Sequence, residues 1–274
     1  MVPGATVAAC IITLLVSLVL PVVVLIVFSL RNKKQGILSA WLLGAAGFFV
    51  TQILIRLPIL TVLQSQSRFA EFAQNNLFIY AFTLAFTAGL FELAGRFAVA
   101  KLMEKNLTQK RALAAGLGHG GIEAMLLIGM TYVNNLIYIG MINSGYFDTL
   151  LAQTAGMGVD VSQLELIRTQ LIGMSPALFL LAGFERLLTM LAHTAMSVLV
   201  CYGVAHKKVG TCLLLCLGIH TLMDLTAGIS MALPQNIAYP IIYGILIIMT
   251  VISGIILKRI LHCWQPLPPT PAEA

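Results

Sequence analysis

The sequence predicts an all-α protein, a polytopic membrane helical bundle of about seven transmembrane helices. The first observation is composition: 59% of the 274 residues are hydrophobic and only 9% are charged, whereas charged residues make up about 25% of a soluble domain. The second is that the apolar residues gather in long runs separated by short polar segments. The third is that Lys and Arg fall mainly in every second one of these segments.

Each apolar run is long enough to cross a bilayer, since a spanning helix needs about 20 mostly apolar residues. The first run lacks a positively charged start and is too long for a signal-peptide core, so we expect it to be retained. We expect one membrane domain, 1–274, with two leading spans in 1–77, the core spans in 78–232, and the last span and a tail in 233–274. The predicted spans are 5–30, 37–63, 78–101, 112–141, 177–205, 209–232 and 237–257.

The positions of the basic residues predict the orientation, because basic loops stay in the cytoplasm. The loops after spans one, three, five and seven carry eleven Lys and Arg residues, whereas the other loops carry only Arg68 and Arg168. This predicts an N-terminus outside and a C-terminus inside, with the Pro-rich tail 266–274 in the cytoplasm. The outer segment 143–176 is expected to form a short amphipathic helix at the interface.

The net charge of +6 would favour nucleic-acid binding in a soluble protein, but here it follows from the cytoplasmic loops, so we expect no nucleic-acid partner. The five cysteines are scattered through apolar runs with no Cys-x-x-Cys pair, which predicts neither a disulfide framework nor a thiolate metal site. We expect the protein to contact membrane lipid and to lie in the cytoplasmic membrane of a bacterium.

Ten ionisable residues lie inside the predicted spans, where each costs several kcal/mol and is by default a functional candidate. We interpret Arg56 as paired with a helix carbonyl or an acid, and Arg186 as forming a structural ion pair with Glu185. In chain order the ten are Arg56 in span two, Glu92 and Arg96 in span three, His119 and Glu123 in span four, Glu185, Arg186 and His193 in span five, and His220 and Asp224 in span six.

Seven of these residues form the candidate catalytic site. Three pairs have i, i+4 spacing, which places both members on one helix face, about 6 Å apart. Most of the seven lie eight to fourteen residues from the nearest basic loop, or about 12 to 21 Å at 1.5 Å per residue. Side chains at one depth can converge, so we expect a shared cavity that opens towards the cytoplasm. The seven are Glu92, Arg96, His119, Glu123, His193, His220 and Asp224.

Four glycines, Gly116, Gly118, Gly120 and Gly121, surround His119. Small residues in a span either allow close helix packing or leave room for a ligand. Because a histidine and a glutamate adjoin these glycines, we favour room for a ligand.

Carboxylates and imidazoles in such a cavity suit amide hydrolysis, in which a base deprotonates water and a donor stabilises the oxyanion. Either Glu92 or Glu123 could be the base. We predict no organic cofactor, but a zinc ion is an alternative, since imidazole nitrogens and carboxylate oxygens also bind zinc. The His-Glu-x-x-His motif of many zinc proteases is absent. The zinc ligands would be His119, Glu123, His193 and His220.

The order of these motifs resembles that of the YhfC family. The motifs are Glu92-x-x-x-Arg96, Gly118-His119-Gly120-Gly121-Ile122-Glu123, Glu185-Arg186 ahead of His193, and His220-x-x-x-Asp224. That family belongs to the glutamic-type intramembrane proteases, a broader group that includes type II CAAX prenyl endopeptidases and PrsW-like proteases. The resemblance covers about spans three to six, and its specificity lies in motif order.

The resemblance implies that a glutamate activates water and that histidines, with an Asn or Asp, bind the transition state. By position, Glu92 and Arg96 match a Glu-Glu-x-x-x-Arg motif in which Phe91 replaces the first Glu. Glu123 matches the polar residue of the second motif, whose frequent opening aromatic residue is His119 here. His220 and Asp224 match the last motif, His-x-x-x-Asn/Asp. The prediction is an intramembrane endopeptidase that acts on a hydrophobic or membrane-anchored peptide.

Two other classes of protein remain as alternatives. A proton-coupled transporter would also use histidine and carboxylate chains, but such proteins often show inverted repeats, and no repeat is visible. A catalytically inactive membrane scaffold would keep a similar outline. Glu92→Gln separates the three, because it would abolish uptake by a transporter, abolish cleavage by a protease, and change neither in a scaffold.

Overall fold

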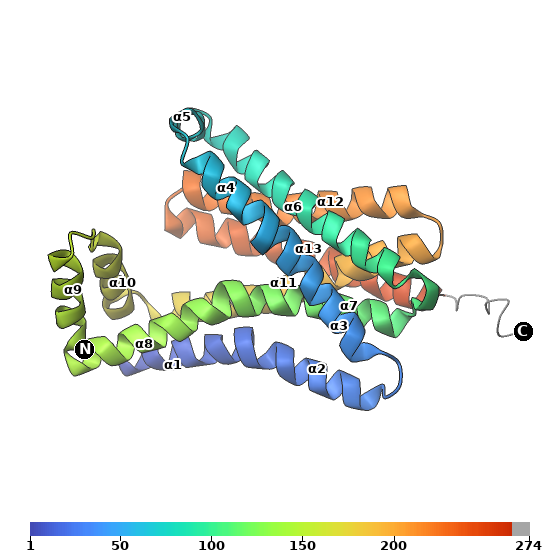
Figure 1. Ribbon diagram of the computed structural model, residues 1–274, viewed down its shortest axis with the longest axis horizontal. Coiled ribbons are helices and arrows are strands. Elements are labelled where there is room, and N and C mark those ends of the chain that lie inside the picture. Colours follow the sequence, from blue (N-terminus) through green and yellow to red (C-terminus); the bar gives the residue numbers. More distant parts are fainter. Residues whose placement is uncertain (265–274) are drawn as a thin grey trace, which may run out of the picture. The chain divides into compact units, whose positions relative to one another are not determined.

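Across residues 1–264, the part of the chain that the structure describes, every regular element of this computed structural model is helical (Figure 1). Seven helices of this part are long and apolar enough to cross a membrane, which confirms the predicted spans. The predicted orientation of the termini stays a prediction, and the tail 266–274 lies outside the described residues. The seven are Gly4–Arg31, Ile37–Gln64, Leu77–Leu102, Gln109–Ser144, Pro176–Ala205, Val209–Ala232 and Gln235–Cys263.

Three of the spans contain a π-helical segment between two α-helical ones. π-Helical segments are rare in proteins overall, and those that occur are often found at functional sites. The first span consists of α1 (Gly4–Leu14), η1 (Leu15–Val19) and α2 (Leu20–Arg31); the second of α3 (Ile37–Phe48), η2 (Phe49–Arg56) and α4 (Leu57–Gln64); the fourth of α7 (Gln109–Glu123), η4 (Ala124–Gly129) and α8 (Met130–Ser144).

The other four spans are single α-helices, and short helices fill the connections. The segment 143–176 holds two short helices where one was predicted, and the helix after the second span was not predicted. The single-helix spans are α6 (Leu77–Leu102), α11 (Pro176–Ala205), α12 (Val209–Ala232) and α13 (Gln235–Cys263). The short helices are α5 (Ser67–Asn75), the 3₁₀ turn η3 (Glu104–Asn106), α9 (Tyr146–Gly156) and α10 (Ser162–Gly173).

The chain divides into two compact units, of which the first comprises Met1–Val23 and Ala124–Leu187. Inside it, Arg186 donates to Glu185, as predicted. At the start of α10, the backbone N–H and then the hydroxyl of Ser162 donate to Asp160, and these bonds lower the pKa of that carboxyl. The prediction of a single membrane domain stays a prediction.

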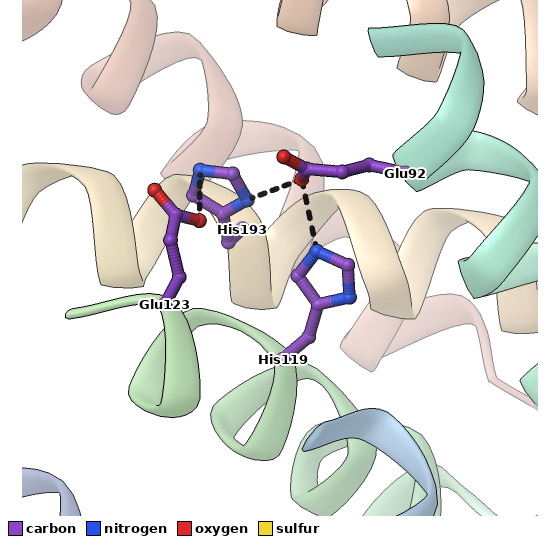
Figure 2. A group of neighbouring side chains, drawn as sticks. All are labelled: Glu92, His119, Glu123 and His193. Carbon is purple, nitrogen blue, oxygen red and sulfur yellow. Dashed lines mark hydrogen bonds and ion pairs between the residues drawn. The ribbon is translucent and has the colours of Figure 1, made fainter. Parts of the chain in front are cut away.

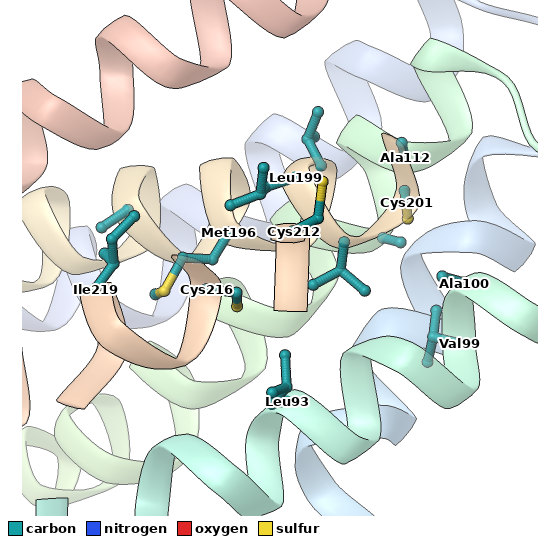
Figure 3. Close-up of a cluster of buried hydrophobic side chains, with 14 of the residues drawn as sticks. Leu93, Val99, Ala100, Ala112, Met196, Leu199, Cys201, Cys212, Cys216 and Ile219 are labelled. Carbon is teal, nitrogen blue, oxygen red and sulfur yellow. The ribbon is translucent and has the colours of Figure 1, made fainter. Parts of the chain in front are cut away.

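The second unit comprises Val24–Glu123 and the chain from Leu188 onward. Its buried core joins α6, α7, α11 and α12, with small side chains and the thiols of Cys201, Cys212 and Cys216 between larger ones (Figure 3). All five cysteines of the chain are free thiols. This unit contains all seven residues of the candidate site.

Helices α3 and α7 approach so closely that glycine is required at their contact. A Cβ at Gly44 would lie 1.9 Å from the carbonyl oxygen of Ala115, and a Cβ at Gly118 would lie 2.0 Å from that of Trp41. A Cβ at Gly120 would lie 3.1 Å from His193 Cβ. At Gly118 the glycine therefore serves helix packing, and the interpretation that it leaves room for a ligand was wrong there.

Gly118→Ala should lower the free energy of unfolding by about 1–3 kcal/mol, the usual effect of overpacking, because the obstacle is the backbone of Trp41 and not a flexible side chain. Denaturant titration of the purified protein measures the change. The matched control is Gly218→Ala in α12, where an added Cβ meets nothing within 4 Å. Equal effects of the two substitutions would contradict the role assigned to Gly118.

Candidate active site

The structure brings the seven predicted residues together from four helices of one unit. Six of them are buried, with at most 8% of each residue exposed. The exception is Asp224, whose side chain is 35% exposed. Glu92 and Arg96 come from α6, His119 and Glu123 from the last turns of α7, His193 from the middle of α11, and His220 and Asp224 from α12.

Glu92 lies at the centre of the cluster, and both of its carboxylate oxygens accept hydrogen bonds. Its Oε2 is 2.9 Å from Arg96 Nη2 and 2.9 Å from His119 Nε2. Its Oε1 accepts a bond of 2.6 Å from the side-chain amide of Gln52. The ring of His193 lies between Glu92 and Glu123 (Figure 2), with Nδ1 3.5 Å from Glu92 Oε2. Glu92 is therefore held on several sides at once.

Arg96 determines which nitrogen of two histidines carries the proton. Its Nη2 lies 2.5 Å from Nδ1 of His193, and its Nη1 lies 3.2 Å from Nδ1 of His220. A guanidinium only donates hydrogen bonds, so both Nδ1 atoms accept. In a neutral imidazole the other nitrogen then carries the proton, and both rings present an N–H at Nε2.

Each of these Nε2–H groups faces a carboxylate. His193 Nε2 is 3.1 Å from Glu123 Oε2, and His220 Nε2 is 3.2 Å from Asp224 Oδ2. Two parallel chains, Arg96-His193-Glu123 and Arg96-His220-Asp224, thus start from one guanidinium. Sequence spacing predicted the pair His220/Asp224, but the pairing of His193 with Glu123 joins two helices and needs the fold.

The two carboxylates at the ends of these chains are the more exposed part of the cluster. The side chains of Glu123 and Asp224 are 10% and 35% exposed, against 2% for His119 and His220. Each carboxylate lies one helical turn farther from its basic loop than the histidine four residues before it. The more exposed end of the cluster therefore lies farther from the basic loops, and the predicted opening towards the cytoplasm stays a prediction.

Gln52 is a residue that the sequence reasoning missed. It lies in η2 and is 6% exposed. Arg56 Nη1 donates to its Oε1 (3.3 Å), which leaves its amide nitrogen to donate to Glu92. Arg56 itself donates to the carbonyl oxygen of Leu84 (2.7 Å), so its predicted pairing with a helix carbonyl is confirmed. A neutral amide does not stand out in an apolar span as a charged residue does. The one hint in the sequence is that Gln52 lies four residues before Arg56, which places both side chains on one helix face.

Gln52→Leu should lower the free energy of unfolding by about 1.5–3 kcal/mol, the usual contribution of a hydrogen bond to a charged group. The substitution removes the only described hydrogen-bond donor to Glu92 Oε1 and keeps a side chain of similar volume at position 52. Denaturant titration checks it. Gln64→Leu in the same span is the control, because Gln64 donates to the neutral hydroxyl of Tyr80. An equal loss in both variants would contradict the link to Glu92.

The donor set at the site fits a metal ion such as zinc. Four buried residues, Glu92, His119, Glu123 and His193, each offer a ligand atom, and these atoms lie within 4.8 Å of one another (Figure 2). Imidazole nitrogens and carboxylate oxygens are common zinc ligands. The set shares three members with the predicted one, but Glu92 takes the place of His220. Arg96 already contacts Glu92 and His193, so a metal ion and this guanidinium would draw on the same side chains.

Membrane-length helices around a buried group of histidines and carboxylates define a polytopic membrane protein with a buried site that could hold a metal ion. The family model described as YhfC intramembrane metalloprotease matches residues 16–247, and the chain belongs to this family of intramembrane proteases. The uncharacterized membrane protein YhfC of Bacillus subtilis (strain 168) is 31% identical over 196 residues, which cover 70% of this chain and 73% of the relative. No solved structure matches at a significant level.

Proposed function

We propose that the protein hydrolyses peptide bonds of membrane-associated substrates with water that Glu123 activates. The observation that carries this proposal is the chain Arg96-His193-Glu123. It ends in a carboxylate at the more exposed end of the cluster, 3.1 Å from Nε2 of His193, the nitrogen that Arg96 leaves protonated. A base within hydrogen-bond reach of water and held in a defined orientation is what general base catalysis requires.

Glu92 is the less suitable base in this geometry, because its oxygens already accept from Gln52, Arg96 and His119. We assign it the role of an anchor that holds Arg96 and His119 in place. Of the two glutamates, we therefore propose Glu123 as the base.

The reaction follows the ordinary course of amide hydrolysis. Glu123 takes one proton from water while the water oxygen forms a bond to the peptide carbonyl carbon. The Nε2–H of His220, which lies 3.2 Å from Asp224 before substrate binds, turns from that carboxylate to the carbonyl oxygen as negative charge develops there, a contribution of about 3 kcal/mol for one such donor. The C–N bond then breaks, and Glu123 returns its proton to the leaving nitrogen.

The substrate class follows from the location of the site. The cluster lies inside membrane-length helices, so a hydrophobic or membrane-anchored peptide can reach it from the bilayer. With basic loops in the cytoplasm, the N-terminus lies outside a bacterial cytoplasmic membrane. Peptides would then approach from the end that holds Glu123 and Asp224, away from the basic loops.

A metal-dependent protease is the second candidate, which the family description and the donor set favour. Glu92, His119, Glu123 and His193 would hold the ion. When bound, a zinc ion acidifies water and polarises a carbonyl.

Cleavage of a library of membrane peptides by the purified protein in liposomes tests the function, with and without a chelator and with zinc content measured. Cleavage that resists the chelator supports carboxylate-activated water. Cleavage lost with the chelator and restored by zinc makes the second candidate correct. No cleavage under any condition, from protein with its native thermal unfolding transition, would rule out both.

A further inference from the structure

A small cavity lies directly beside the candidate site. Its lining, contributed by α3, α6, α7 and α11, includes Gly44, Arg96, Ala115, His119, Ser197 and Cys201. The centre of a water molecule has about 10 Å³ of room in it. One water needs at least about 10–15 Å³ on this measure, so the cavity has room for one water and for nothing larger.

Two buried polar atoms of this lining have no hydrogen-bond partner within residues 1–264: Arg96 Nε and Ser197 Oγ. The two residues are only 3% and 4% exposed. A buried polar group without a partner costs about 1–3 kcal/mol, and native proteins commonly satisfy such groups with ordered water. The cavity thus has an unpaired donor and an unpaired hydroxyl in its wall.

His119 supplies a third polar group. Its Nε2 is 2.9 Å from Glu92 Oε2, an oxygen that also accepts from Arg96. Because a carboxylate accepts, His119 donates from Nε2, and Nδ1 of its neutral ring is then an acceptor. Arg96 Nε needs an acceptor and His119 Nδ1 needs a donor. A water molecule is both.

We propose that one resident water molecule occupies this cavity and bridges Arg96 Nε, Ser197 Oγ and His119 Nδ1. The water accepts the N–H of Arg96, donates one O–H to His119 Nδ1 and shares its other hydrogen bond with Ser197. Three partners is the usual number for a buried water.

Ser197 is then a positioning residue, which acts through the water on the ring that holds Glu92. The water keeps the proton of His119 on Nε2, where it faces Glu92. The water site depends only on the cavity and its partners, whereas its effect on peptide hydrolysis rests on the proposed function.

A high-resolution structure of the full-length protein should show one ordered water within hydrogen-bond distance of all three atoms. Nitrogen-15 NMR of histidine-labelled protein gives a second readout, with the His119 signals assigned by their loss in His119→Gln. We expect a protonated Nε2 and an unprotonated Nδ1 shifted by a hydrogen bond. Ser197→Val fills the cavity and should remove that shift, whereas Ser197→Ala leaves room for the water and should keep it.

The matched control is Ser253→Val in α13, since Ser253 is also a buried serine, 1% exposed, with an unpartnered hydroxyl, but does not line the cavity. It should leave the His119 signals unchanged. A cavity without water density, or His119 signals that Ser197→Val and Ser253→Val change equally, would overturn the proposal. If Ser197→Val does not fold, the wild-type density and signals decide. Absence of cleavage by the wild type would overturn the proposed function and leave the water site standing.

Discussion

Glu123→Gln should lower the kcat of peptide cleavage by roughly 10²–10⁴-fold, the usual contribution of a general base. The substitution keeps the size of the side chain and an oxygen at the position that lies 3.1 Å from His193 Nε2, but an amide cannot take a proton from water. The unfolding temperature of the variant shows whether a loss of kcat comes with a loss of stability. Cleavage of a membrane peptide in liposomes and a thermal scan of the same preparation give both quantities.

Glu104→Gln is the matched control, since Glu104 pairs with Lys101 at the surface and its side chain is 48% exposed. It should leave both kcat and stability unchanged.

Glu92→Gln should lower kcat and also the unfolding temperature, because it weakens the bonds from Arg96, His119 and Gln52. If Glu92→Gln abolished cleavage at full stability and Glu123→Gln cleaved normally, the roles assigned to the two glutamates would be exchanged.

The seven spans could be predicted from composition because a helix that crosses hydrocarbon must be long and mostly apolar. The convergence of the site was predictable as well, since residues such as His119 and His220 lie at similar depths from the basic loops. Depth constrains only one dimension, however. It could not show that Glu92, and not His220, joins the group of potential metal ligands.

Other features depend on which way helix faces turn, and sequence spacing does not determine that across helices. The pairing of His193 with Glu123 and the buried position of Gln52 are of this kind. The prediction for Gly118 was wrong for the same reason. The sequence does not show whether the space beside a glycine holds a ligand or the backbone of a neighbouring helix. Neutral partners such as Gln52 are the hardest to find, since their burial costs much less than that of a charge.

Arg96→Met should lower the free energy of unfolding by about 3–5 kcal/mol, the usual result of removing one partner of a buried ion pair. Arg96 Nη2 lies 2.9 Å from Glu92 Oε2, and the two side chains are 1% and 5% exposed. Without the guanidinium, Glu92 is a buried charge without its cation, and His193 loses the donor that fixes its proton on Nε2. Denaturant titration in detergent measures the loss of stability.

The double variant Glu92→Leu with Arg96→Met should recover much of this stability, because apolar groups of similar size often replace a buried pair at little cost. It should still fail to cleave peptides, since the donors to His193 and His220 are gone.

The matched control for Arg96→Met is Lys101→Met, which removes the cation of an exposed pair with Glu104 and should lower the free energy of unfolding by at most about 1 kcal/mol. If Arg96→Met cost no more than Lys101→Met, the guanidinium would not be the group that organises the two histidine chains, and the tautomers assigned through it would have to be abandoned.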